Sequence, residues 1–216
     1  MLANGVNGGV HMPRDKTETH EKIIPAAMAE FLEYGFEKAS MRRIAAALDM
    51  SAAALYRHFD GKEAMFAALV EPVVTEFMDI YEKLSAQEFA DIDTAENDKI
   101  WQGESDDSRW VMKFIYEHFD VFTLLVCKAQ GTRYESFVHD VAVMEEKTTL
   151  RYFEMLRRKG IVLNEIDPDE FHLLVSTSVG AIFEAVRHGF TKEKAMHYAV
   201  TLDKFYDRAW KNLIGI

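Results

Sequence analysis

A short basic segment lies in an otherwise acidic chain, and its side chains are of the types that bind phosphate. Between positions 38 and 62 the chain holds two acidic residues and five basic ones, namely Lys38, Arg42, Arg43, Arg57 and Lys62. From position 71 onward it holds 17 basic and 27 acidic residues, and the net charge of the whole chain is −11. This balance excludes nucleic-acid binding over the whole surface and leaves a local basic surface as the candidate.

No pattern for catalysis or metal binding accompanies the basic segment. The eight histidines never occur three or four residues apart, so no helical zinc face of the HExxH type exists. The chain has no GxGxxG loop after a strand, no P-loop and no G-x-S-x-G elbow. Its single cysteine, Cys127, excludes disulfides and CxxC sites, and the apolar stretch L-L-V-C-K predicts a buried, inert thiol. We therefore expect no enzyme, no metal and no cofactor.

Composition and hydrophobic spacing predict an all-α protein. The 216 residues are 49% apolar and 28% charged, values typical of folded globular chains. Apolar residues recur at helical spacing nearly throughout, and no alternating strand pattern of useful length occurs. No apolar run suffices to span a membrane, and the N-terminal stretch lacks the pattern of a secretory signal. These features predict a soluble protein of the cytoplasm.

The chain divides into three expected parts. Residues 1–14 are rich in Gly and Asn and are expected to be disordered, residues 15–70 to form a small helical domain, and residues 71–216 a larger one. In the small domain, helices are predicted at 23–34, 41–48 and 52–58, the last two capped by Ser40 and Ser51. Asp60 and Glu63 predict a capping box that opens a long helix, which Pro72 should bend.

Further helices are predicted in the larger domain from start and stop signals. They span about 110–128, with a break near Asp120, then 134–159, 168–188 and 192–213. Asp167 followed by Pro168 is a strong helix start, Thr191 caps the last helix, and glycines end the two helices before it. Residues 91–108 show weak periodicity and are predicted as a loop or a frayed helix.

Residues 40–58 follow the plan of a helix-turn-helix, two short helices joined by a three-residue turn. An apolar inner face is formed by Ile44, Ala45, Leu48, Met50 and Leu55. Left outside are Arg42, Arg43, Tyr56, Arg57, His58 and Lys62, which suit contacts with phosphates and base edges. The plainer alternatives are that Tyr56 and Phe59 only join two helices in the core and that Arg43 is a solvated charge.

The segment from about 20 to 70 resembles the DNA-binding domain of the tetracycline-repressor (TetR) family. The matching strings are I-I-P-A-A-M-A-E-F-L-E-Y-G-F, S-M-R-R-I-A-A-A-L-D-M-S-A-A-A-L-Y-R-H-F and D-G-K-E, in this order. The resemblance implies an all-α homodimer with N-terminal helix-turn-helix DNA-binding domains and C-terminal helical domains for ligand binding and dimerisation. Its implied partners are double-stranded DNA with a palindromic operator and a small-molecule effector.

Carried onto this sequence, the resemblance implies DNA contacts from both short helices. The expected contact residues are Ser40, Arg42, Arg43, Ser51, Ala52, Ala53, Tyr56, Arg57, His58 and Lys62. Asp49 stands where the family usually has Gly, which Asp tolerates because it visits left-handed conformations. The triple alanine at 52–54 offers little hydrogen-bonding readout, so we expect specificity to rest on Arg42, thymine methyl contacts and DNA shape. It also keeps open the alternative of a ligand- or partner-binding helical protein with a weakened DNA-binding head.

The larger domain is expected to hold a ligand pocket and a dimer interface. Aromatic and Met-rich helices suit a flat hydrophobic effector, although the same residues also suit a plain core. The candidate pocket residues are Trp110, Phe114, His118, Phe122, Tyr134, Phe137, Met144, Phe183 and Glu184, the last offering a buried charge. The candidate dimer residues in the last two helices are Ser176, Gly180, Ala181, Leu202, Phe205, Tyr206, Ala209, Trp210 and Leu213. The sequence thus predicts a ligand-responsive dimeric regulator, and we expect a repressor.

Overall fold

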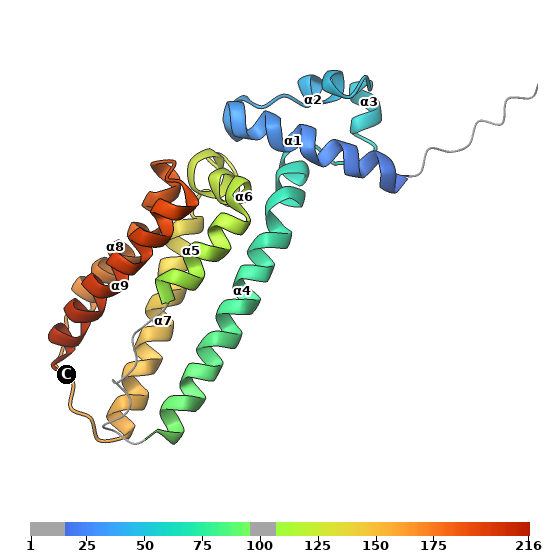
Figure 1. Cartoon of the computed structure of the whole chain (residues 1–216). Coiled ribbons are helices and arrows are strands. Elements are labelled where there is room, and N and C mark those ends of the chain that lie inside the picture. Colours follow the sequence, from blue (N-terminus) through green and yellow to red (C-terminus); the bar gives the residue numbers. More distant parts are fainter. Residues whose placement is uncertain (1–15, 96–106) are drawn as a thin grey trace, which may run out of the picture.

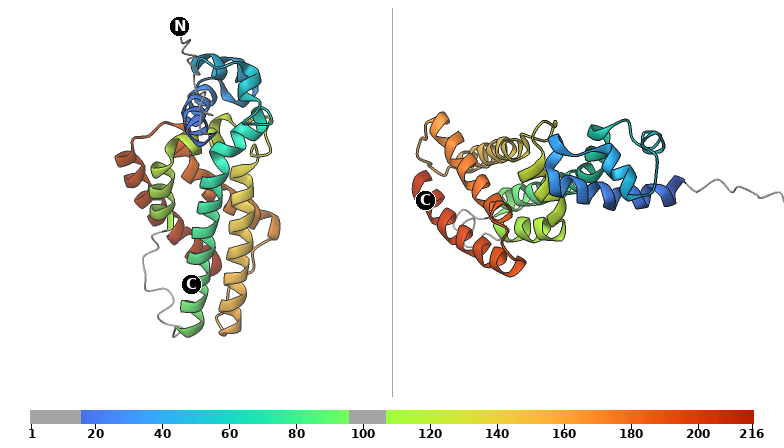
Figure 2. Two further views of the ribbon diagram at one scale, coloured as in Figure 1. Left: turned by 90° about the vertical axis from the view of Figure 1, so that its right-hand side faces the viewer. Right: turned by 90° about the horizontal axis from the view of Figure 1, so that it is seen from above.

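The computed structural model describes residues 16–95 and 107–216, and within them the chain is helical without any strand (Figure 1). The predicted all-α class is therefore confirmed. The expected disorder of residues 1–14 and most of the predicted loop at 91–108 lie outside the described residues. Three N-terminal helices sit across one end of a long helix, and the remaining helices pack beside that long helix (Figures 1 and 2).

The N-terminal head consists of α1 (Lys16–Lys38), α2 (Met41–Ala47) and α3 (Ala52–Leu55). Helix α1 begins well before the helix predicted at 23–34. The sequence predicts that this helix begins near Pro25 or bends there, and Pro25 lies inside α1. Gly35 directly follows the helix predicted at 23–34 and is a typical helix-ending residue. In the structure it forms a kink at φ 70 and ψ 167, and one further turn follows. A residue without a Cβ suits this positive φ, and the change of direction leads the chain toward α2.

The turn chemistry of the helix-turn-helix follows the sequence closely. The Ser40 and Ser51 side chains accept from the backbone N–H groups of Arg43 (3.4 Å) and Ala54 (3.1 Å), so both predicted caps are confirmed. Asp49 takes φ 52, the left-handed conformation expected of a residue that replaces Gly in this turn. The predicted inner face is buried at Ile44, Ala45 and Leu55 and half-buried at Leu48 and Met50, so α2 and α3 share one core with α1.

Helix α4 (Lys62–Thr94) runs from the head along the whole length of the body. The predicted capping box is wrong, because Gly61 rather than Asp60 is the N-cap and no side chain caps this end. Glu63 consequently lies one position too close to the helix start to reach back to Asp60. Pro72 lies within α4, which remains one helix of 33 residues. Head and body are therefore joined by a continuous helix rather than by a loop.

The body is completed by α5 (Asp107–Glu117), α6 (Phe119–Thr123), α7 (Phe137–Arg158), α8 (Pro168–Arg187) and α9 (Lys192–Ile214). A π-helical segment, η1 (Leu124–Lys128), follows α6 and packs against α1 and α8. The break expected near Asp120 falls at His118. Cys127 in η1 is exposed, which contradicts the prediction of a buried thiol. The wider π turn rotates Cys127 away from Leu124 and Leu125, which are buried.

The cap of α8 gives a test of the sequence-based helix start. The Asp167 carboxylate accepts from the backbone N–H groups of Asp169 (3.0 Å) and Glu170 (3.2 Å). Asp167→Ala should lower the free energy of unfolding by about 1 kcal/mol because two helix-end donors lose their acceptor. Urea unfolding measures this loss. Asp169→Ala is the control, because Asp169 caps nothing through its side chain in the described structure and should cost less.

None of the described helices combines the length and the apolar character that a bilayer crossing demands.

Candidate functional site

The two short helices of the head present a surface that faces away from the body (Figures 1 and 2). Exposed on this part of the chain are Arg42, Arg43, Ser51, Ala53, Tyr56 and Arg57, whereas Ser40, Ala52, His58 and Lys62 are half-buried. Tyr56 is 52% exposed, and its neighbour Phe59 is buried as the core alternative predicted. Short helices that carry exposed Arg, Tyr and Ser side chains can contact both phosphates and base edges.

The two adjacent arginines of α2 differ in their surroundings. Within residues 16–95 and 107–216, the Arg42 side chain makes no hydrogen bond or ion pair. Arg43 is bound by α1, because its Nε donates to Glu30 Oε1 (2.9 Å) and its Nη2 donates to the carbonyl of Lys38 (2.8 Å). Its guanidinium carbon also lies 4.2 Å from the centre of the Tyr34 ring. Arg42 is therefore available to a ligand, whereas Arg43 is already engaged.

Lys62 also has partners within the protein. Its Nζ donates to the carbonyl of Glu37 (2.9 Å) and lies 4.5 Å from the centre of the Phe36 ring. Both partners belong to the last turns of α1, so Lys62 joins the start of α4 to the end of α1. A phosphate contact by Lys62 would share this ammonium with Glu37.

Sequence reasoning missed Glu30, which organises the start of α2. Its side chain is 8% exposed, and Oε1 accepts from the backbone N–H of Ser40 (2.7 Å) as well as from Arg43. The available signal was its position, seven residues after Ile23 and three after Ala27 on the apolar stripe of α1. A carboxylate on a buried stripe requires a partner, and Arg43 is that partner.

The predicted pocket residues form a closed aromatic cluster in the body. Phe122 is 0% exposed, and its ring centre lies 6.0 Å from Phe77, 6.0 Å from Phe114, 6.1 Å from Phe137 and 6.4 Å from Phe183. Trp110 stacks on Phe77 and His118 packs on Phe114, so both adjoin the same cluster. The rings fill one another's space, so a ligand would enter only by displacing them.

Three other predicted pocket residues lie apart from these rings or differ from expectation. Tyr134 packs against Phe66 of α4 near the head (5.9 Å), and Met144 is half-buried at the edge of the core. Glu184 contradicts the prediction of a buried charge, because its side chain is 41% exposed and pairs with Arg187 (2.5 Å) and His188 (3.4 Å). Its neighbours in α8 are apolar, but Glu184 itself points to the solvent-facing side of the helix.

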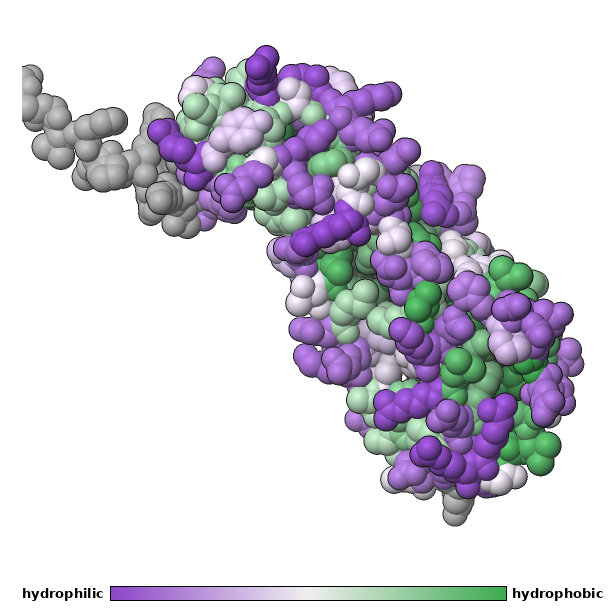
Figure 3. Space-filling view, turned by 180° about the vertical axis from the view of Figure 1, so that it is seen from behind, coloured by the Kyte–Doolittle hydropathy of each residue, from purple (hydrophilic) through white to green (hydrophobic). Residues whose placement is uncertain are grey.

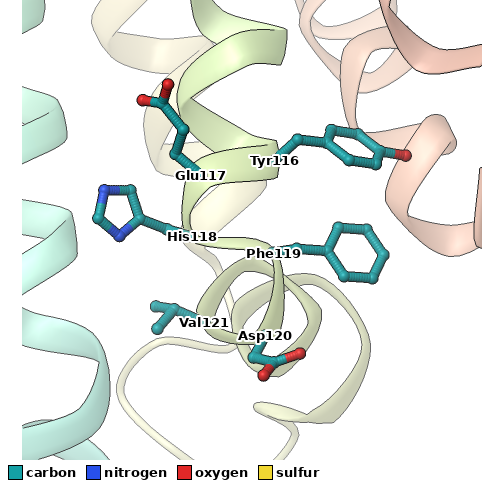
Figure 4. A pocket seen from close by; sticks show the side chains of 6 residues that line it. All are labelled: Tyr116, Glu117, His118, Phe119, Asp120 and Val121. Carbon is teal, nitrogen blue, oxygen red and sulfur yellow. The ribbon is translucent and has the colours of Figure 1, made fainter. Parts of the chain in front are cut away.

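A surface hollow of about 390 Å³ lies at the junction of α5 and α6. Its side chains diverge, since Tyr116 and Phe119 point toward one side while Glu117 and His118 point toward α4 (Figure 4). Tyr116 donates to the carbonyl of Phe190 (2.8 Å), and His118 lies 3.8 Å from Glu76 of α4. The hollow follows from the break at His118. Because its side chains diverge, it lacks the enclosed shape of a ligand pocket.

A second hollow of about 530 Å³ lies where the far ends of α4 and α7 meet. Its lining is mainly charged and comprises Asp93, Arg151, Glu154, Met155, Arg158 and Lys159. Neither hollow therefore coincides with the buried aromatic cluster.

Tyr81 and Glu145 join α4 to α7. The Tyr81 hydroxyl donates to Glu145 Oε2 (2.7 Å), and Thr149 Oγ1 donates to Glu145 Oε1 (3.3 Å). Burial and the nearby Glu145 charge raise the pKa of Tyr81 well above its ordinary value. The phenol therefore stays protonated and remains a donor, so this contact fixes α7 relative to α4.

The outer face of α8 and α9 is unusually apolar. Leu173 is 64% and Phe205 66% exposed, and the space-filling view shows apolar surface over these helices (Figure 3). Of the predicted dimer residues, Ala209 is also exposed, whereas Ser176, Gly180, Ala181, Tyr206 and Leu213 are half-buried. Leu202 and Trp210 differ, because Leu202 is buried within this single chain and Trp210 packs on Phe171 (5.8 Å). These two residues stabilise the body's own core.

Comparison with known proteins matches the head to one family. Residues 23–69 match the model of the bacterial regulatory proteins of the tetR family. Over 48 residues the chain is 44% identical to the HTH-type transcriptional repressor Rv1474c of Mycobacterium tuberculosis, an alignment that covers 22% of this chain. The chain thereby spans 26% of the length of that repressor. The match to the family model thus falls on the head and the start of α4.

Solved structures extend the likeness to the whole fold. A TetR-like transcriptional regulator from Rhodococcus sp. RHA1 has a TM-score of 0.52 at 19% identity, with 95% of this chain and 100% of that chain covered. The fatty acid degradation regulator FadR from Bacillus halodurans has a TM-score of 0.53 at 13% identity, with 91% of this chain and 96% of that chain covered. At these identities the likeness concerns the fold alone.

Proposed function

We propose that this chain is a member of the tetR family of bacterial regulatory proteins and acts as a ligand-responsive repressor that binds a palindromic operator as a homodimer. Family members are DNA-binding transcriptional regulators rather than enzymes, in agreement with the absence of catalytic motifs from the sequence. We place DNA binding in residues 15–70, ligand binding and dimerisation in residues 71–216, and the protein in the cytoplasm.

The observation that carries the proposal is the exposed basic helix-turn-helix on an acidic molecule. In it, Arg42 of α2 is exposed, as are Tyr56 and Arg57 directly after α3, and these short helices face away from the body. Because the body is strongly acidic, it repels the DNA backbone and favours contact through the head. Two such heads, held about 34–36 Å apart, would meet successive major grooves of a palindromic site.

The proposed response to a ligand depends on the contacts between body and head. Arg133, in the loop between η1 and α7, pairs with Glu71 of α4, and the backbone N–H of Arg133 donates to Glu63 (3.4 Å). Tyr134 of the same loop packs on Phe66, which packs in turn on Phe31 of α1 (5.2 Å). A hydrophobic or aromatic effector that displaced Phe122 or Phe137 would move this loop and thereby α4 and the head.

Such a ligand must bind the DNA-free and DNA-bound states with different affinities, because a ligand with equal affinities does not shift the equilibrium between them. The name of the FadR neighbour specifies fatty acid degradation for that protein. For this chain, the aromatic cluster supports a hydrophobic effector class.

Binding-site selection from a random pool of double-stranded DNA tests the function. The wild-type chain should enrich a palindrome at moderate salt, and the double variant Arg42→Ala/Tyr56→Ala should not, because both side chains are exposed on the proposed contact surface. Circular dichroism and sedimentation verify that both proteins are folded and in the same oligomeric state.

Enrichment of the same palindrome by the double variant would contradict the assignment of these two residues. If the folded, dimeric wild type enriched no sequence, the alternative of a ligand- or partner-binding protein with a weakened head would be favoured. The triple alanine in α3 is the feature that supports this alternative.

A further inference from the structure

Arg42 and Arg43 follow one another on α2, yet of the two only Arg43 has side-chain partners among the residues that the structure describes. Nε and Nη2 of Arg43 both lie at Glu30 Oε1, at 2.9 and 2.5 Å, while Nη2 also donates to the Lys38 carbonyl. Nε and Nη2 lie along one edge of the guanidinium, so this edge is turned toward α1 and away from the exposed surface of α2. The ring of Tyr34 covers the guanidinium at 4.2 Å.

Glu30 fixes two groups at the start of α2 with one buried oxygen. Oε1 accepts from the backbone N–H of Ser40, the N-cap residue, and from the Arg43 side chain in the first turn. The Ser40 hydroxyl in turn accepts from the Arg43 backbone N–H (3.4 Å). Ser40, Arg43 and Glu30 therefore form one hydrogen-bonded unit that sets where α2 begins and how it is oriented on α1.

We propose that Arg43 is a positioning residue for DNA binding, which together with Glu30 holds the start of α2 so that Ser40 and Arg42 reach the phosphates. This inference rests on the proposed function and changes the role that the sequence assigned to Arg43. Because Glu30 is buried, removal of Arg43 leaves a buried carboxylate without its charged partner, and removal of Glu30 leaves the Ser40 N–H without its side-chain acceptor. Either change should alter the orientation of α2.

The test measures the affinity for the selected operator as a function of salt concentration. A lost phosphate contact reduces the slope of log affinity against log salt by about 0.9, because one fewer counterion is released. Arg42→Gln should show this reduction. Arg43→Gln should keep the wild-type slope and lose roughly tenfold in affinity at every salt concentration. Equal slope reductions for the two variants would show that Arg43 is a phosphate contact and overturn the proposal.

Variants at Glu30 provide a second test, because the positioning role and its alternative predict opposite changes in operator affinity. If Glu30 and Arg43 act as one unit, Glu30→Gln should weaken operator binding like Arg43→Gln, and the double variant should lose no more than either single one. If Glu30 merely withheld Arg43 from DNA, Glu30→Gln would increase the affinity. Such an increase, or additive losses in the double variant, would contradict the positioning role.

Further measurements separate positioning from a purely stabilising role. The affinities are compared at a temperature far below the unfolding midpoint of each variant. There, substitution of a residue that only stabilises the head leaves operator affinity unchanged. Substitution of a positioning residue lowers the ratio of operator affinity to non-specific affinity. Arg43→Lys retains the charge without the forked geometry, so it should remain impaired, and recovery of wild-type affinity would overturn the proposal. If the wild type binds no DNA, the proposed function fails first and this inference with it.

Discussion

Replacement of Phe205 by glutamate is expected to yield a monomer and to weaken operator binding by at least about 100-fold. Phe205 is 66% exposed on α9, and Leu173 is 64% exposed on α8. Apolar surface lies over these two helices (Figure 3). In the proposed dimer, a carboxylate within this apolar interface would lose its hydration without gaining a partner. A dimer that engages two half-sites gains about 10²–10⁴-fold over separate heads, and the monomer forfeits this gain.

Sedimentation velocity measures the oligomeric state of this variant, and fluorescence anisotropy with the selected operator measures its affinity. Val162→Glu is the matched control, because Val162 is 87% exposed in the segment between α7 and α8 and receives the same new charge. The control should remain dimeric and bind as the wild type does. A dimeric Phe205→Glu variant with unchanged affinity would refute the proposed interface.

Phe122→Ala is expected to lower the free energy of unfolding by about 3–5 kcal/mol, because the surrounding rings cannot fully close the space that is left. Phe122 is 0% exposed and adjoins four phenylalanine rings drawn from α4, α5, α7 and α8. Removal of its ring therefore loosens four helices at once. Urea unfolding at a fixed protein concentration measures the loss, since the proposed dimerisation would contribute to the apparent stability.

Val162→Ala is the control for this truncation, and it should change the free energy of unfolding by no more than about 0.5 kcal/mol. A loss below about 1 kcal/mol for Phe122→Ala would show that the aromatic cluster already contains open space. In that case the effector could enter without displacing the rings.

The helix-turn-helix could be predicted almost residue by residue because its signals are local. Ser40 and Ser51 lie directly before the helices that they cap. Asp49 takes the left-handed backbone conformation in the turn between α2 and α3. The capping box failed because Asp60 and Gly61 compete for one position, and a residue at φ 103 favours glycine. Sequence spacing alone does not resolve such a competition.

Long-range pairing was beyond what the sequence could supply. Arg43 meets Glu30 from 13 residues away and Arg133 meets Glu71 from 62 residues away, so neither pair leaves a local pattern. Glu184 was misjudged for a related reason, since apolar neighbours in the sequence do not establish on which side of α8 it lies. The aromatic cluster, in contrast, was predicted as a group because many of its members recur at helical spacing.

Because α4 is unbroken, a small tilt of its end in the body produces a larger displacement of the head. At 1.5 Å per residue, its 33 residues make a rod about 50 Å long. A tilt of only about 5° at the far end of such a rod displaces the opposite end by about 4 Å, which exceeds the 3.4 Å rise of one base pair. Two rods tilted in opposite directions would change the separation of the heads by about two base-pair steps. A rearrangement of a few side chains around one ligand is therefore geometrically sufficient to take both heads out of step with the double helix.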